Sequence, residues 1–274
     1  MADFSRTKLL LVGCGKMGGA MLHGWLARGL VPSRVVVVEP AGAALGDLGE
    51  RGITHVTRGE DLPASFRPDV VVLAVKPQMM DDAIRPCAGL VRPQLLFLSI
   101  AAGKTIAYFQ RHLGGEAVIV RAMPNTPAAV GRGISVAVAN PNAAPAERDL
   151  ADRLLAACGE VAWVEDESLI DPVTAVSGGG PAYVFLLMEV LAEAGRKAGL
   201  PTDLAMRLAR ITVSGSGELA RLSAEPAGEL RRAVTSPKGT TLEALNILMA
   251  PDGLQPLFDR AIAAATRRSR ELAN

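Results

Sequence analysis

The chain has few aromatic residues and no excess of charge of either sign. Phe, Trp and Tyr together make up 4% of its 274 residues, so the core must be built mainly from Ala, Val, Leu and Ile, as in buried parallel strands and close-packed helices. The formal net charge is +1, from 29 basic and 28 acidic residues. With this balance the chain has no excess of positive charge of the kind that binds nucleic acid or an anionic membrane. The expected partners are therefore small molecules and further copies of the chain.

Cysteine, histidine and long apolar runs are also scarce. Cys14, Cys87 and Cys158 are odd in number and have no C-x-x-C spacing, which favours a reducing compartment. The three histidines form no cluster with other ligand residues, so no metal site is expected. Gly13 and Lys16 interrupt the apolar run near the N-terminus before it reaches the length of a signal peptide. No run approaches the roughly 18 apolar residues that span a bilayer, and we therefore expect a cytoplasmic protein without a membrane segment.

The first part of the chain alternates short β-branched runs with amphipathic stretches. The runs predict strands at residues 8–13, 35–39, 53–56, 70–75, 95–100, 117–120, 134–139 and 161–165. Because these runs are apolar on both faces and are separated by helical crossovers, they predict a doubly wound, mostly parallel α/β sheet of about eight strands.

Beyond Ser168 the strand signals stop, and helical periodicity continues to the C-terminus. Turn residues interrupt it at 199–201, 225–226, 236–239 and 251–253. We therefore predict two domains, residues 1–167 with the sheet and residues 168–274 as an all-α domain. The stretch 182–188 is apolar on every face, and the next helix carries small residues at 214–217, so the helical domain is expected to form an obligate dimer.

A glycine-rich fingerprint follows the first predicted strand directly and opens a helix. It reads Gly13-Cys14-Gly15-Lys16-Met17-Gly18. In such a strand, turn and helix, the first glycine permits a tight turn, the second a close approach of the pyrophosphate, and the third helix–strand packing. The sequence therefore predicts a Rossmann-like dinucleotide-binding domain, the alternative being a structural turn that happens to be rich in glycine.

Glu39 ends the second predicted strand, at the position where an acidic side chain accepts hydrogen bonds from the adenosine ribose. A carboxylate beside a 2′-phosphate would cost on the order of 4 kcal/mol at 4 Å and an effective dielectric of 20. No Lys or Arg lies between Glu39 and Arg51 to offset that cost. NADH is therefore favoured over NADPH, unless Glu39 turns into solvent.

Three further segments follow predicted strands, and the carboxyl ends of parallel strands are where such folds bind ligands. They are Ala74-Val75-Lys76-Pro77, Ala101-Ala102-Gly103, and the turn at 123–127 that contains Asn125. We expect all three to line the cofactor site, although Lys76 is equally compatible with a solvated cation at a helix start.

Two Gly/Ser turns in the helical half precede helices, where free N–H groups bind anions. They are Ser177-Gly178-Gly179-Gly180 and the segment from Ser236 to Thr240 and Thr241. Both suit a small carboxylate substrate, and the alternative for the second is an ordinary Ser/Thr helix cap. The acidic run at 165–167 is either a solvated loop or places one carboxylate, such as Glu167, at the substrate.

These motifs together resemble the pyrroline-5-carboxylate reductase family over nearly the whole chain. The most specific stretches are Ser177-Gly-Gly-Gly-Pro-Ala-Tyr183 and Ser236-Pro-Lys-Gly-Thr-Thr241. The resemblance implies reduction of L-1-pyrroline-5-carboxylate to L-proline with NADH or NADPH, and a homodimer, often assembled as a pentamer of dimers, with the active site at the dimer interface. It also implies that Thr241 lies near the ring nitrogen, and that Thr240, Glu167 and the turn at 177–180 line the substrate pocket.

The chain departs from the family pattern at four positions. Gly179 stands where serine is usual, and Lys238 stands where glycine is usual. Ala233 and Gly59 replace residues that are often polar near the cofactor. None of these changes removes an indispensable group, so they predict a shifted affinity or substrate range.

Two other functions are compatible with the same two-domain plan. A β-hydroxyacid dehydrogenase would need a lysine acid/base on the long interdomain helix, and Lys197 lies near a helix end, which is a poor place for it. A non-catalytic nucleotide-binding protein would also fit the altered turns.

Overall fold

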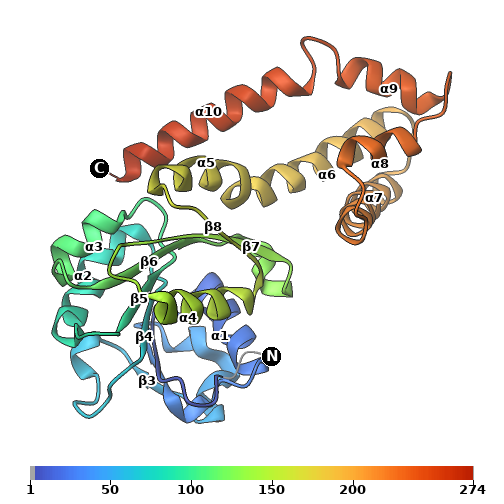
Figure 1. Cartoon of the computed structure of the whole chain (residues 1–274). Helices are drawn as coiled ribbons and strands as arrows, with labels where there is room; N and C mark the ends of the chain where they lie inside the picture. The colour runs from blue at the N-terminus through green and yellow to red at the C-terminus, as the bar shows by residue number, and fades with distance from the viewer. Residues whose placement is uncertain (1–3, 274) are drawn as a thin grey trace. The chain divides into compact units, whose positions relative to one another are not determined.

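The computed structural model describes residues 4–273, with side chains for all of them except 43–47 and 273. The first part of the chain is built on one eight-stranded sheet, with the strand order β3-β2-β1-β4-β5-β6-β7-β8 (Figure 1). The strands are β1 (Leu9–Val12), β2 (Val35–Val38), β3 (Thr54–Val56), β4 (Val70–Leu73), β5 (Leu96–Ser99), β6 (Val118–Met123), β7 (Gly133–Ala139) and β8 (Gly159–Trp163). Every neighbouring pair is parallel except β6 and β7. The predicted mostly parallel, doubly wound α/β fold is confirmed.

Except at the end of β6, the strands begin and end within two residues of the predicted bounds, and the two that differ most in extent are β6 and β8. The strand predicted to stop at Val120 continues to Met123, because the charged side chain of Arg121 is buried in an ion pair with Glu167 and does not end the strand. The last strand starts at Gly159, where a Cβ atom would lie 1.8 Å from the carbonyl oxygen of Gly133. Glycine is required at position 159 by this close approach of two backbones. Because the strand begins with glycine and not with an apolar side chain, no apolar pattern in the sequence marks its start.

The helices of the second half are separated at all four predicted breaks. The α-helices of the described chain are α1 (Lys16–Ala27), α2 (Met80–Ile84), α3 (Ile106–Leu113), α4 (Pro145–Ala156), α5 (Ile170–Val173), α6 (Gly180–Lys197), α7 (Thr202–Leu222), α8 (Ala227–Ala233), α9 (Thr240–Leu248) and α10 (Leu254–Ala273). A 3₁₀ turn, Glu167–Leu169, precedes α5, and a π-helical turn, Thr174–Gly178, joins α5 to α6.

Alternation along the central strands builds a core on each face of the sheet. In β1, Leu9 and Leu11 belong to the core on the side of α1 and α4, whereas Leu10 and Val12 belong to the core with α2 and α3. All four side chains are buried, as expected for strands covered by helices on both sides. The sheet edge formed by the carboxyl ends of these strands is therefore held rigidly.

The described chain falls into two compact units. One contains the sheet and runs to Gly178, and it also includes the chain from Ala265 onward; the other is Gly179–Ala264. The division after residue 167 that the sequence suggests remains a prediction about domains.

The second unit exposes many large apolar side chains. On α6 these include Phe185, Leu186 and Val190, each more than half exposed. The helical stretch Glu167–Lys197 is also long and apolar enough to cross a membrane by length and composition, with 11% of its most apolar window buried. No long uninterrupted apolar run marks this stretch, because residues 177–181 and Glu189 interrupt it, although the mean hydropathy of its most apolar window is 1.4.

Candidate active site

The fingerprint turn has the geometry that a dinucleotide pyrophosphate requires. Gly13 has φ +93°, and a Cβ atom there would lie 2.9 Å from the carbonyl group of Ala74. A Cβ atom on Gly18 would lie 2.3 Å from the carbonyl oxygen of Gly13. Gly15, in contrast, would place a Cβ atom in open space with no atom within 4 Å, and it caps α1 without a side chain. The N–H groups at this helix start are thus open to an anion.

Glu39 is held against the fingerprint turn. Its Oε2 accepts the N–H of Cys14 at 2.8 Å, its Oε1 accepts the N–H of Ala41 at 3.0 Å, and its carbonyl oxygen lies 2.7 Å from Nε2 of His55. The carboxylate therefore points back toward the turn and not into solvent. Burial and, secondly, the charge of Glu39 raise the pKa of the Cys14 thiol to about 11, so this thiol is protonated at neutral pH.

A cavity of about 330 Å³ lies beside Glu39, at the ends of β1 and β2, and includes Val12, Val38, Pro40, Thr57, Arg58, Gly59, Met79 and Pro86 in its lining. A Cβ atom on Gly59 would lie 2.6 Å from Cγ of Pro86, so the ring of Pro86 explains why no larger residue stands at position 59. Arg58 is a basic residue in this lining that was not predicted from sequence, because it lies beyond the segment from Glu39 to Arg51. Its guanidinium lies 3.5 Å from Asp61.

The loop after β4 lies at the same sheet edge as the fingerprint. The N–H of Ala74 donates to the carbonyl oxygen of Val12 at 2.8 Å, which aligns the ends of β4 and β1. Val75 packs against the core with α2 and α3. Lys76 is exposed and precedes the 3₁₀ turn Pro77–Met79, which leaves both interpretations of this cation open.

The loop after β5 is fixed from two sides. Oγ of Ser99 accepts the N–H of Ala101 at 3.2 Å, and Ala102 is half-buried. Gly103 has φ +72°, and a Cβ atom there would lie 2.9 Å from the carbonyl oxygen of Leu272. Glycine at position 103 is thus required by packing against the end of α10, whether or not a cofactor contacts it.

Asn125 organises the turn after β6. Its Oδ1 accepts the N–H of Ile134 at 3.0 Å, and the 3₁₀ turn Thr126–Val130 follows it directly. This bond fixes the turn against the start of β7.

The three carboxylates of the acidic run have three different environments. Glu165 is 87% exposed, and its Oε1 lies 3.8 Å from Arg148. Asp166 accepts the N–H of Ser168 at 2.8 Å, and hydrogen bonds from the side chain and backbone of Ser168 lower the pKa of this carboxyl. Only Glu167 turns inward.

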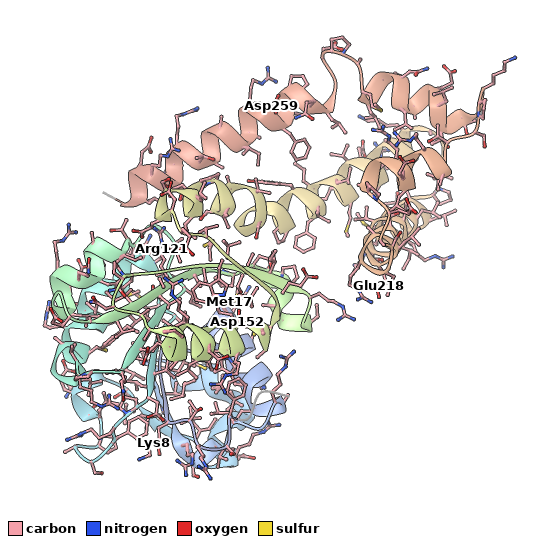
Figure 2. The ribbon with its side chains drawn as sticks, viewed as in Figure 1. Lys8, Met17, Arg121, Asp152, Glu218 and Asp259 are labelled. Carbon is pink, nitrogen blue, oxygen red and sulfur yellow. The ribbon has the colours of Figure 1, made fainter. Side chains whose placement is uncertain are left out.

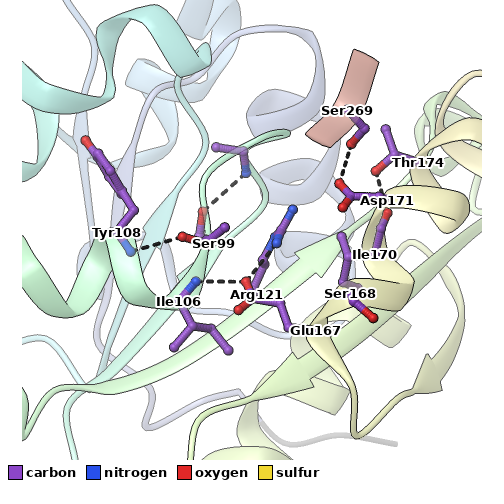
Figure 3. A network of polar contacts seen from close by, with 12 residues as sticks. Ser99, Ile106, Tyr108, Arg121, Glu167, Ser168, Ile170, Asp171, Thr174 and Ser269 are labelled. Carbon is purple, nitrogen blue, oxygen red and sulfur yellow. Dashed lines mark hydrogen bonds and ion pairs between the residues drawn. The ribbon is translucent and has the colours of Figure 1, made fainter. Parts of the chain in front are cut away.

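Glu167 forms an ion pair with the buried side chain of Arg121. Its Oε1 lies 2.7 Å from Nη1 of Arg121 and also accepts the N–H of Ile106 at 2.8 Å (Figure 3). Arg121 lies on β6 (Figure 2), and its side chain is 3% exposed. Its Nη2 has no hydrogen-bond partner within the described chain. Sequence reasoning missed Arg121, although a single charge beside an apolar strand was the available signal.

The glycine-rich turn before α6 is tightly packed at one end and open at the other. Gly178 would place a Cβ atom 2.6 Å from Cε of Met123, whereas Gly180 has no atom within 4 Å of that position. Gly179 is the residue before α6 and offers no side-chain cap. Oγ of Ser177 is buried and has no hydrogen-bond partner in the described part of the chain.

The second hydroxyl-rich turn is not an ordinary Ser/Thr cap. Gly239 is the N-cap of α9, and the helix begins at Thr240. Thr240 and Thr241 are both exposed in the single chain, so their hydroxyls are free for a ligand. Lys238 has φ +60°, a left-handed conformation that glycine adopts without strain.

Known proteins match nearly the whole chain. Residues 167–272 match the family model described as pyrroline-5-carboxylate reductase dimerisation, and residues 8–103 match the model described as NADP oxidoreductase coenzyme F420-dependent. A pyrroline-5-carboxylate reductase of Pseudomonas aeruginosa is 39% identical over 98% of both chains, and one of Escherichia coli is 35% identical over 97% of this chain and 98% of its own.

Solved structures agree with these sequence matches. A pyrroline-5-carboxylate reductase from Coxiella burnetii has a TM-score of 0.90 and 34% identity, covering 98% of this chain and 99% of its own. A Plasmodium falciparum pyrroline carboxylate reductase with NADP bound has a TM-score of 0.83 and 28% identity, covering 99% of this chain and 100% of its own.

The dimerisation model starts at residue 167, where the apolar helical stretch starts. Self-association thus accounts for the exposed apolar side chains of α6 without a membrane. With relatives of this identity matched over nearly their full length, the chain belongs to the pyrroline-5-carboxylate reductase family of NAD(P)-dependent oxidoreductases.

Proposed function

We propose that the chain reduces L-1-pyrroline-5-carboxylate to L-proline with a nicotinamide cofactor, the last step of proline biosynthesis, in the cytoplasm. The observation that supports the substrate assignment best is the start of α9, where Gly239 takes the cap position and both threonine hydroxyls remain free. The family relationship supplies the identity of the imine.

The residues of the sheet edge fit a nicotinamide dinucleotide. When bound, it supplies the hydride for the reduction. The fingerprint turn would hold the pyrophosphate at the open start of the helix, since among its glycines only Gly15 has free space beside it. The residues of this contact would be Gly13, Gly15, Lys16, Met17 and Gly18. Glu39 would accept hydrogen bonds from the adenosine ribose, and the loops with Ala74, Val75, Lys76, Pro77, Ala101, Ala102, Gly103 and Asn125 would line the rest of the site.

The substrate residues act by binding and orientation. The Thr241 hydroxyl would hydrogen-bond the ring nitrogen and exchange its proton with solvent. Thr240 and the N–H groups at 177–180 would hold the carboxylate, at the start of a helix where negative charge is favoured. Reduction adds a hydride to the imine carbon, C2 of the pyrroline ring, and leaves an amine, so the nitrogen must carry a proton at that moment. The reacting carbon must be held within about 3–3.5 Å of the donor.

NADH is the preferred cofactor in this proposal. The hydrogen bonds from Cys14 and Ala41 keep the Glu39 carboxylate at the ribose end, where it would repel a 2′-phosphate. Arg58 is the group best placed to oppose this preference, but Asp61 lies within 3.5 Å of it.

The active enzyme is proposed to be a homodimer formed through the helical half, and five dimers assembling into a decamer is the arrangement that the resemblance implies. A β-hydroxyacid dehydrogenase is not favoured, because Lys197 is the last residue of α6 and its Nζ lies 3.7 Å from Glu193.

The deciding assay follows oxidation of NADH and of NADPH, in turn, with pyrroline-5-carboxylate. Turnover of the imine with a higher kcat/KM for NADH is expected. Oxidation of hydroxy acids without imine turnover would reject the proposal in favour of a dehydrogenase, and NADH binding without turnover of any substrate would indicate a non-catalytic protein.

A further inference from the structure

Glu167 links elements that lie far apart in the sequence. Its Oε1 accepts both the N–H of Ile106 and a hydrogen bond from Nη1 of Arg121 (Figure 3). Ile106 is the first residue of α3, where free N–H groups carry partial positive charge. A carboxylate is favoured at this helix start, so one oxygen of Glu167 joins the start of α3 to β6.

The start of α3 in turn fixes the loop after β5. At the beginning of that loop, Ala101–Gly103, the N–H of Ala101 donates to Oγ of Ser99. After it, Oγ1 of Thr105 accepts the N–H of Tyr108 at 3.1 Å, and Glu167 takes the N–H of Ile106. The loop proposed to line the cofactor site is therefore fixed at both ends, with Glu167 at the second.

The turn that carries Ser177 packs against β6, the strand that also carries Arg121. Arg121 and Met123 are two residues apart on β6, so their side chains leave the sheet on the same face. Arg121 binds Glu167 at the beginning of the segment, and Met123 would lie 2.6 Å from a Cβ atom on Gly178 at its end. Between these two points the chain is α5 and the π-helical turn.

We infer that Glu167 and Arg121 are positioning residues for hydride transfer, and that Glu167 does not contact the substrate. Their ion pair sets the Ala101–Gly103 loop relative to the turn at Ser177 and Gly178. The inference rests on the proposed function, which assigns the cofactor to the loop and the substrate carboxylate to the turn. A misplacement of about 1 Å can lower such a rate by about 100-fold.

The kinetic test compares Glu167→Ala and Glu167→Gln with Glu165→Gln, a matched control two residues away whose side chain is exposed. Glu167→Ala is expected to lower kcat by roughly tenfold to 100-fold with the KM for pyrroline-5-carboxylate changed less than about threefold. Glu167→Gln should lose less, because a carboxamide oxygen still accepts both hydrogen bonds, and it carries the test if the alanine variant does not fold. The control should match the parent enzyme.

The second readout is hydrogen exchange of the same proteins without cofactor, followed by mass spectrometry. In Glu167→Ala, peptides containing Ile106 and Ser177–Gly178 should exchange at least about fivefold faster, while peptides from β1 should be unchanged. A tenfold rise in KM at unchanged kcat would show a direct substrate contact and overturn the inference, as would unchanged exchange at both peptides. If the parent enzyme does not reduce the imine, the proposed function fails, and the exchange result alone decides whether the two segments are linked.

Discussion

Alanine in place of Gly15 and of Gly18 separates ligand binding from folding within one turn. Gly15 has φ −69° and ψ −165°, which alanine adopts readily, and its Cβ atom would meet nothing within 4 Å. Gly15→Ala should therefore change the free energy of unfolding by less than about 1 kcal/mol, mostly through the weaker capping preference of alanine. The added methyl group would occupy the space proposed for the pyrophosphate, so the Kd for NADH should rise at least about tenfold, or about 1.4 kcal/mol.

Gly18→Ala is expected to have the opposite profile. Its Cβ atom would lie 2.3 Å from the carbonyl oxygen of Gly13, and a backbone atom cannot move aside as a side chain can. Overpacking of this kind costs up to about 3 kcal/mol, of which about 1 kcal/mol is returned by the helix propensity of alanine. A net loss of about 2 kcal/mol lowers the Tm of a chain of this size by about 4–8 °C.

Both variants are measured by thermal unfolding without ligand and by calorimetric titration with NADH. Gly115→Ala is the control, since Gly115 lies outside the candidate site in the loop before β6, and its Cβ atom would also meet nothing within 4 Å. If Gly15→Ala binds NADH as tightly as the parent protein does, the pyrophosphate does not approach this turn, and the assignment of the fingerprint is wrong.

Three further predictions concern single side chains. Thr241→Ala should lower kcat by roughly tenfold or more with the Kd for NADH nearly unchanged, because the hydroxyl acts on the substrate nitrogen; steady-state kinetics at an unchanged kcat would reject that role. Glu39→Ser should narrow or reverse the preference for NADH, and equal NADH/NADPH ratios of kcat/KM in both forms would contradict the ribose contact. Lys238→Gly should raise the free energy of unfolding by about 1 kcal/mol, measured by urea denaturation, by relieving a left-handed lysine at φ +60°, and a lower stability would show that the lysine side chain makes a stabilising contact.

The fold was predictable from sequence because its strands are buried on both faces. In β1, β2, β4 and β5 every residue is buried, so uninterrupted apolar runs marked them directly. The strand ends were less predictable, since Arg121 is a charged residue inside β6, paired with Ser99 on β5 and Val138 on β7, and its charge is offset by Glu167. That contact joins residues 46 positions apart, and local patterns carry no information about it.

The parts of the candidate site where the backbone conformation requires glycine were predictable from sequence. The hydrogen-bond and ion-pair partners of its side chains were less predictable. The fingerprint glycines have the separate steric environments that their order implied. The run at 165–167, in contrast, contains three adjacent carboxylates that are equivalent in sequence. One faces solvent, one caps its own turn and one is bound by Arg121, and only the tertiary fold distinguishes them.

These environments bear on how an enzyme of this kind accelerates a reaction. Thr240 and Thr241 offer hydroxyl groups, which are weak acids, and the turns offer backbone N–H groups, which do not titrate near neutral pH. Groups of this kind contribute through fixed dipoles and placement, and they lose their effect once the backbone that carries them can move. The carboxylate of Glu39 accepts the N–H of Cys14 in the fingerprint turn. The carboxylate of Glu167 accepts the N–H of Ile106 at the start of α3, which follows the loop after β5. Substitution of the residues that hold these loops should therefore reduce the rate by a factor comparable to substitution of a residue that touches the substrate.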